Sequence, residues 1–166
     1  MRHLVGLFVV VAVVLLSPLT VVRSQEATPT TNDPAAMHAA FAQAVQTNDP
    51  DAFAALFAPD GVLVTPFGTF QGPAEAGAFF AQLIETNPDL TQTTSEPTVV
   101  LNTAVSRDEV AAETFRAAGA ERIIIIHTLV VANGQIVALI AMPDPDDPAT
   151  TQVFAAMQAP AATPAA

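Results

Sequence analysis

The sequence contains no cysteine and no lysine, and its only basic side chains besides histidine are five arginines. Without cysteine the chain has neither a disulfide framework nor a thiol for lipid attachment, so its stability must come from a hydrophobic core. It also lacks a glycine-rich phosphate loop, a nucleophile elbow and an HExxH segment. His3, His38 and His127 have no metal-ligand spacing, and we expect neither a metal nor another cofactor.

Acidic residues outnumber basic residues strongly. Without residues 1–24, Arg107, Arg116 and Arg122 remain against 16 acidic residues, a formal net charge of −13. Such a surface repels nucleic acid and anionic membranes, so we expect neither as a partner once the N-terminal segment is removed.

Residues 1–24 have the pattern of a secretory signal peptide. The chain begins Met1-Arg2-His3, continues with an apolar run over residues 4–16, and has Pro18 near the end of that run. We therefore expect a secreted or extracytoplasmic protein. An uncleaved membrane anchor is the alternative, because the apolar stretch approaches the roughly 20 residues that span a bilayer.

One folded domain is expected between two flexible segments. Residues 25–32 and 159–166 are rich in proline, threonine and alanine and lack hydrophobic periodicity. Residues 33–142 form the expected domain, which is long enough for a single core. Residues 143–158 combine an acidic proline loop with a short predicted helix, Ala149–Gln158.

Three helices are predicted in the first half of the domain. Asn32-Asp33-Pro34 and Asn48-Asp49-Pro50 each place a capping residue before a proline at the first helical position. The first helix should end near Gln46, and His38 lies outside its apolar stripe, so we expect His38 in solvent. Pro73 starts the third helix.

The other segments predict β-strands. They cover residues 62–65, 69–71, 91–101, 109–117, 122–131 and 135–142. Turns are expected at Pro59-Asp60-Gly61, at Arg107-Asp108 and, as a tight hairpin, at Asn133-Gly134. Helices followed by an antiparallel meander predict an α+β fold with the helices on one face of a curved sheet.

Three segments resemble motifs of a known superfamily. They are LFAPDGV (56–62), FQGPAEAGAFFAQL (70–83) and NGQIVALIAM (133–142). In this order and spacing they are similar to the nuclear-transport-factor-2-like superfamily, which includes SnoaL-like polyketide cyclases, steroid Δ-isomerases and scytalone dehydratases. The resemblance covers nearly all of residues 33–142. It implies a cone-shaped α+β barrel, with three helices wrapped by a strongly bent sheet and an apolar pocket open at one end.

The resemblance does not support steroid-isomerase chemistry in this chain. Those isomerases use a carboxylate base, a tyrosine and a protonated aspartate. The matching positions here hold Thr65, Phe41 and His127, respectively. Phe41 has no hydroxyl, and a threonine cannot hold a proton at neutral pH in place of the base. Whether the chain is an enzyme stays open, and a noncatalytic role is favoured.

His127 is the most prominent candidate site residue. It interrupts the apolar run IIII-H-TLVV, which predicts a buried position in the middle of the sheet. It is either a neutral core histidine with a hydrogen-bond partner or the polar group of the pocket floor, able to act as a general base. The predicted pocket residues are Phe41, Phe53, Leu63, Thr65, Phe80, Ile125, His127 and Leu129.

Several acidic residues are weaker candidates. On a strand, Glu113 could be a buried carboxylate base, or it could pair with Arg122 or face solvent. Strand alternation would place Glu113 and Arg116 on opposite faces, without an ion pair. Asp60 belongs to the predicted turn. Asp144, Asp146 and Asp147 lack the glycine and glutamate of a calcium loop, and we expect them in solvent.

Three functional hypotheses follow. In the first, the exported protein binds a small apolar ligand in the pocket without catalysis. In the second, it is a lyase, isomerase or cyclase with His127 as general base and Thr65 or Glu113 as helper. In the third, it is a structural domain that forms a homodimer through the open face of its sheet.

Overall fold

The computed structural model describes residues 32–158, which form helices packed on a seven-stranded sheet. The predicted signal peptide (1–24), the tail (159–166) and all of the predicted linker except Asn32 lie outside the described residues. The helices are α1 (Pro34–Gln46), α2 (Pro50–Ala55), α3 (Gly72–Thr86), α4 (Glu113–Ala117) and α5 (Pro148–Gln158). The strands are β1 (Phe57–Thr65), β2 (Gly68–Gln71), β3 (Thr91–Thr93), β4 (Thr98–Val100), β5 (Thr103–Ala111), β6 (Ile123–Ala132) and β7 (Gln135–Pro143).

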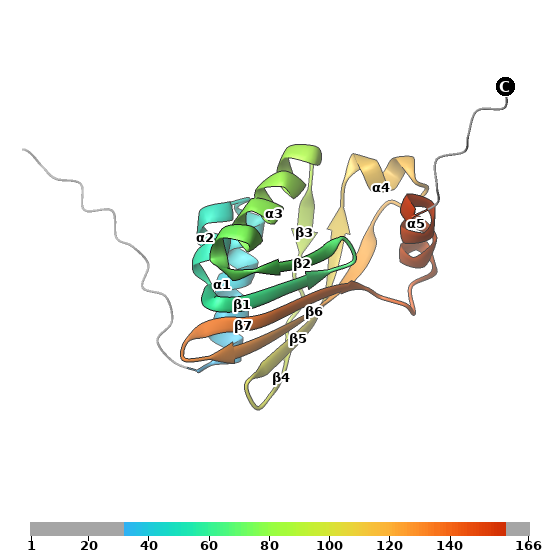
Figure 1. Cartoon of the computed structure of the whole chain (residues 1–166). Helices are drawn as coiled ribbons and strands as arrows, with labels where there is room; N and C mark the ends of the chain where they lie inside the picture. The colour runs from blue at the N-terminus through green and yellow to red at the C-terminus, as the bar shows by residue number, and fades with distance from the viewer. Residues whose placement is uncertain (1–31, 159–166) are drawn as a thin grey trace, which may run out of the picture.

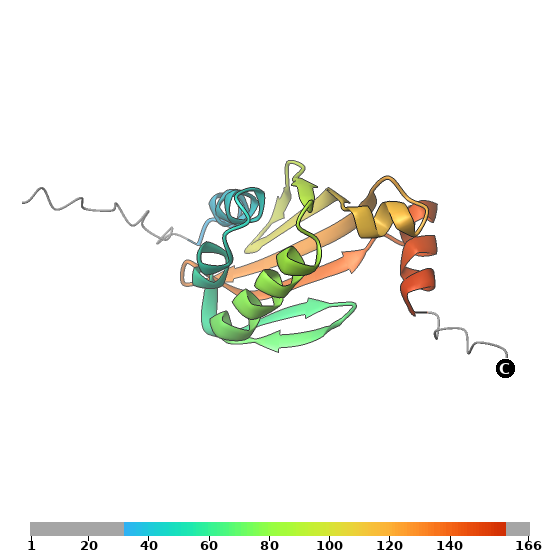
Figure 2. The same cartoon turned by 90° about the horizontal axis from the view of Figure 1, so that it is seen from above.

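The helices cover one face of a curved sheet that does not close on itself. Its strand order is β2-β1-β7-β6-β5-β3, and β4 also pairs with β5. Figures 1 and 2 show α1, α2 and α3 over this face, and α4 and α5 at the far end of the long strands. The predicted α+β fold is confirmed. Within residues 32–158, no helix is both long and apolar enough to cross a membrane.

Local signals explain where the first two helices begin. Asp33 Oδ1 accepts hydrogen bonds from the backbone N–H groups of Ala35 and Ala36, at 2.9 and 3.3 Å. Asp49 Oδ1 accepts from the N–H of Ala52 at 2.9 Å. In both helices a proline follows the cap, where its missing N–H costs no hydrogen bond. Both predicted starts are confirmed.

The hairpin between β6 and β7 also forms where the sequence predicts it. Asn133 and Gly134 both have positive φ angles, 53° and 73°. A two-residue turn with two positive φ angles matches the right-handed twist of the strands that it joins. The pairing of β1 differs from the predicted antiparallel arrangement, because β1 pairs with β7 in parallel, with Leu63 opposite Leu139.

The predicted strand over residues 109–117 is right only for its first three residues. Residues 109–111 are the end of β5, which begins earlier, and residues 113–117 form the short helix α4. The predicted turn at Arg107-Asp108 is wrong as well, since both residues lie within β5. Side chains of β5 alternate, and Ala104, Ser106, Asp108 and Val110 are the buried ones. A carboxylate is tolerated on this buried face because it has hydrogen-bond donors around it.

Two smaller expectations also need correction. Residues 91–101 form two short strands, β3 and β4, instead of one. Pro59-Asp60-Gly61 lies inside β1, where the register with β7 shifts between Phe57 and Val62. Between Phe57 and Val62, β1 has more residues than the paired part of β7. This irregularity lets the chain bend there without leaving the sheet.

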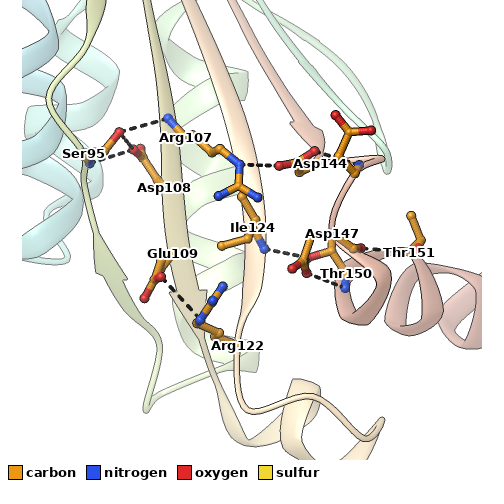
Figure 3. A network of polar contacts seen from close by, with 11 residues as sticks. Ser95, Arg107, Asp108, Glu109, Arg122, Ile124, Asp144, Asp147, Thr150 and Thr151 are labelled. Carbon is orange, nitrogen blue, oxygen red and sulfur yellow. Dashed lines mark hydrogen bonds and ion pairs between the residues drawn. The ribbon is translucent and has the colours of Figure 1, made fainter.

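Helix α5 is attached to β6 by a buried threonine. Thr150 Oγ1 accepts a hydrogen bond from the Ile124 N–H at 2.7 Å and donates to Asp147 Oδ2 at 2.6 Å. Asp144 is buried and forms an ion pair with Arg107 of β5. Figure 3 shows these contacts at the beginning of β6, beside Ile124. They place Phe154 of α5 against the Phe67 ring, with the centroids 6.1 Å apart.

Candidate functional site

The main cavity lies between the three N-terminal helices and the inner face of the sheet. Its volume is about 580 Å³, within the range of small-molecule sites. Seven of the eight predicted pocket residues line it, namely Phe41, Phe53, Leu63, Thr65, Phe80, Ile125 and His127. Leu129 does not line the cavity; it is fully buried in the core beneath α1 and α2. Phe154 and Met157 of α5 form part of the wall.

His127 lies on the inner face of β6 and has little exposed surface. Its side chain is 8% exposed, and its ring packs on Phe41 with the centroids 5.1 Å apart. The ring atom Nδ1 is 3.0 Å from Asp108 Oδ2, although its N–H is not aimed squarely at that oxygen. The imidazole is therefore held between an aromatic ring and a carboxylate, at the edge of an apolar cavity.

Asp108 of β5 holds several polar groups in place behind the cavity. The Asp108 cluster consists of Gln92, Ser95, Ser106, Asp108 and His127. Besides the contact with His127, the carboxylate accepts hydrogen bonds from Gln92 Nε2 at 3.1 Å, the Ser95 N–H at 3.0 Å and Ser106 Oγ at 3.2 Å. Figure 3 shows Asp108 beside Ser95. Every partner of this fully buried carboxylate is a hydrogen-bond donor.

These donors decide the charge of Asp108. Burial alone would raise the pKa of the carboxyl group. The hydrogen bond and charge of His127, together with the Ser95 N–H and the Ser106 hydroxyl, outweigh burial and lower the pKa below its usual value. Asp108 is therefore a buried carboxylate at neutral pH, with its charge balanced by donors.

His38 of α1 is buried beside this cluster, and the expectation that it faces solvent is wrong. It is 4% exposed, and Nε2 has no hydrogen-bond partner among the described residues. Burial lowers the pKa of His38; the nearby Asp108 charge opposes this shift and His127 adds to it. His38 and Phe41 are three residues apart and so share one side of the helix, with ring centroids 6.1 Å apart.

Thr65 lines the cavity, but its hydroxyl is already used by the turn after β1. Thr65 Oγ1 accepts from the Phe67 N–H at 3.1 Å and donates to the Gly68 carbonyl at 3.3 Å. The side chain is therefore part of the β1–β2 connection. A role as catalytic helper would require it to break these bonds.

Glu113 lies outside the cavity lining, and its predicted strand position is wrong. As the first residue of α4 its side chain is 76% exposed. Its carboxylate is 3.1 Å from the guanidinium of Arg116, one helical turn away, and Arg116 also pairs with Asp89. The pair that strand alternation excluded therefore exists, because residues three apart are neighbours on a helix. Arg122 pairs instead with Glu109 of β5, at 3.3 Å.

Asp108 is the site residue that sequence reasoning missed. A signal was present: Ala104, Ser106, Asp108 and Val110 alternate with residues that face outward. The adjacent charges of Arg107 and Asp108 suggested a turn and concealed this alternation.

The described residues contain no group of three metal-ligating side chains placed to hold an ion. The expectation that Asp144 faces solvent is wrong, since this residue is 3% exposed and pairs with Arg107. Asp147 accepts from Thr150. The acidic loop therefore helps to dock α5.

The comparisons with known proteins agree on the fold. A family model described as SnoaL-like domain matches residues 38–139. No curated protein is similar enough in sequence to this chain to count as a match. Among solved structures, a candidate polyketide cyclase from Sinorhizobium meliloti has a TM-score of 0.57 and 20% identity, over 64% of this chain and 93% of that chain.

Two further solved structures are similar to this chain. One, a candidate ketosteroid isomerase from Kribbella flavida, has a TM-score of 0.56 and 18% identity, over 69% of this chain and 79% of that chain. The other is a protein with a ketosteroid isomerase-like fold from Catenulispora acidiphila, in complex with trimethylamine. It has a TM-score of 0.54 and 18% identity, over 63% of this chain and 82% of that chain. At these identities the likeness concerns the fold alone.

Proposed function

Because the chain belongs to the SnoaL-like domain family, whose fold here encloses a large apolar cavity, we propose that it binds a small, mainly apolar molecule between its helices and its sheet. The observation that carries this proposal is the cavity of about 580 Å³, walled largely by phenylalanine and aliphatic side chains, with His127 at its edge. Such a site recognises its ligand mostly by shape and apolar area, while a few polar groups orient it.

Thermal unfolding in the presence of apolar probes tests this proposal. A ligand that binds only the native state raises the free energy of unfolding by RT ln(1 + L/Kd), where L is the free ligand concentration, so the apparent stability increases with the ligand concentration. We expect steroid-like, terpenoid or fatty probes to raise Tm by several degrees. The Ala141→Trp variant should abolish the shift, because Ala141 lines the cavity and is the partner of His127 in the β6–β7 ladder.

The neighbouring Ile140→Trp variant is a matched control. Ile140 is 38% exposed and does not line the cavity, so the same side chain added there should leave the shift intact. No shift with any probe in the unmodified protein would overturn the proposal.

A second candidate function is enzymatic, and the contact between Asp108 and His127 favours it. A carboxylate at Nδ1 orients an imidazole and stabilises its charged form, which is what a general base requires. The corresponding reaction class is removal of a proton from a carbon next to a carbonyl group, as in isomerases, lyases and cyclases. Exchange of such protons for deuterium in bound ketones, followed by NMR, tests this role. Exchange should disappear in His127→Gln, and a rate equal to that of buffer in the unmodified protein would exclude it.

We also propose that the protein acts outside the cytoplasm. The support is the charged start, apolar run and proline of residues 1–24. Mass spectrometry of the protein recovered from a secreting host tests this. A mature chain that starts near residue 25 is expected; an intact N-terminus in a membrane fraction would favour the anchor instead.

A further inference from the structure

The hydroxyl side chains around the cavity share one property: their hydrogen-bond donors are already occupied within the protein. The lining contains three hydroxyl side chains. Thr65 donates to a carbonyl of the β1–β2 turn, Thr86 to a carbonyl of its own helix and Thr114 to the side chain of Asn87. None of these hydroxyl donors is left for a ligand.

Asp108 imposes the same restriction on the two polar side chains nearest to it. An ionised carboxylate only accepts hydrogen bonds, so any atom that contacts it closely must present a hydrogen. At 3.0 Å from this carboxylate, Nδ1 of His127 carries the ring proton, because two acceptors at that distance would repel each other. For the same reason Gln92 turns its amide nitrogen, and not its oxygen, toward Asp108.

The polar side-chain atoms of His127 and Gln92 that do not contact Asp108 are hydrogen-bond acceptors. In a neutral imidazole with its proton on Nδ1, Nε2 has a free lone pair, and it lies on the side of the ring away from Asp108. Once Gln92 Nε2 is bound to Asp108, Oε1 is the free acceptor of that amide. Both side chains line the cavity. The cavity edge nearest to Asp108 is therefore rich in acceptors and poor in donors.

We propose that the cavity selects apolar molecules that carry a hydroxyl group, or another hydrogen-bond donor, over molecules of the same shape that carry only an ether or carbonyl oxygen. The donor would bind Nε2 of His127 or Oε1 of Gln92. This inference rests on the proposed ligand-binding function and adds the chemical class of the ligand. A buried acceptor left without a donor costs free energy, so the preference arises from both the bond gained and the penalty avoided.

Three probes of nearly equal shape test the inference. 2-Naphthol donates a hydrogen bond, 2-methoxynaphthalene only accepts one, and 2-methylnaphthalene does neither. Dissociation constants are measured by fluorescence or calorimetry at pH 8. We expect 2-naphthol to bind about two- to tenfold more tightly than the other two, the range for one net hydrogen bond.

Variants assign the preference to the proposed atoms. His127→Phe and Gln92→Leu should each weaken the preference for 2-naphthol, and the double variant should bind all three probes with similar affinity. The affinity for 2-methylnaphthalene should stay nearly unchanged in all of them. Asp108→Asn offers an amide N–H to Nδ1, which moves the ring proton to Nε2. The affinity for 2-methoxynaphthalene should therefore increase relative to the affinity for 2-naphthol. If Asp108→Asn does not fold, His127→Phe and Gln92→Leu still test the preference, with circular dichroism as the check on folding.

The outcomes separate this inference from the proposed function. Equal binding of the three probes, or a preference for 2-methoxynaphthalene, overturns donor selection while ligand binding stands. A preference for 2-naphthol that persists in the double variant His127→Phe/Gln92→Leu also overturns it, since the donor would then bind elsewhere. If no probe binds up to its solubility limit, both proposals fail.

Discussion

Ser106 lies directly opposite His127 in the β5–β6 ladder, so both side chains point to the inner face of the sheet. The Ser106 hydroxyl donates to Asp108 Oδ2 at 3.2 Å, the same oxygen that His127 contacts. Neighbouring strands thus supply two donors to one buried carboxylate. Stability, pH response and cavity chemistry all depend on this arrangement.

Replacing Asp108 should destabilise the protein strongly. Asp108→Ala leaves four neighbouring side chains and backbone groups without their acceptor, and we expect a loss of about 3–5 kcal/mol in the free energy of unfolding. Ser106→Ala removes one donor and should cost about 1 kcal/mol. Urea unfolding checks both values. Asp60→Asn, at an exposed position of β1, is the control and should change stability by less than about 0.5 kcal/mol.

Acid should destabilise the protein in two steps. The pKa of His38 is lowered in the native state. Below about pH 6.5 the unfolded chain therefore binds a proton that the native chain does not, and the free energy of unfolding decreases as the pH is lowered. The pKa of Asp108 is also lowered, so its contribution is present above its ordinary pKa and is lost as the pH falls through the native value. The charged or titratable groups that face His38 are Asp108 on β5 and His127 on β6.

Urea unfolding at pH 7 and pH 5 measures the first step. The stability difference between these two pH values should be smaller in His38→Phe than in the unmodified protein. Gln43→Leu, an exposed change on the same helix, should keep the original difference. An unchanged difference in His38→Phe would assign the acid response to other groups.

Thr150 should control how firmly α5 closes the cavity. Thr150→Val removes the hydroxyl that accepts from the Ile124 N–H, which leaves a buried donor unpaired and should cost about 1–3 kcal/mol. Because α5 carries Phe154 and Met157, faster ligand dissociation should accompany this loss. Thr151→Val is the matched control, since the Thr151 hydroxyl is exposed and bonds only carbonyls of its own helix turn.

Hydrogen exchange of the Ile124 amide measures the same bond directly. Its protection should drop in Thr150→Val and stay unchanged in Thr151→Val. Equal protection in both variants would mean that α5 is held by other contacts, chiefly the pair of Arg107 and Asp144.

We propose that two copies associate through the outer face of the sheet. Val105, Thr128 and Ile140 form one row across β5, β6 and β7, and Arg107, Ile126 and Met142 form the next. Val105, Ile140 and Met142 are 37%, 38% and 42% exposed, a run of apolar surface that a partner would cover. Sedimentation should show a dimer that Ile140→Glu dissociates. A monomer at all concentrations contradicts this expectation.

The sequence predicted the features of this fold that depend on neighbours along the chain. Asp33 and Asp49 cap helices within three residues, and Asn133-Gly134 closes a two-residue hairpin. His127 was conspicuous because a single polar residue interrupted an apolar run. In each case the cause and the effect lie within a few positions.

The features that the sequence did not reveal depend on distant contacts. The burial of Asp108 depends on Gln92, Ser95 and His127, which meet it only when β3, β5 and β6 are aligned. The burial of His38 depends on how α1 packs against the same strands. Helix α4 is only five residues long, too short for helical periodicity to be distinguished from strand alternation.

The position of β7 between β1 and β6 has a consequence for how the chain folds. The first strand finds its parallel partner only in the last one, so a long loop must close before the sheet is continuous. A chain that ends before Gln135 would leave β2-β1 and β6-β5-β3 as two separate pieces with unpaired edges. Folding therefore completes only after the C-terminal strand is available, and truncated or stalled chains of this protein should be prone to aggregation.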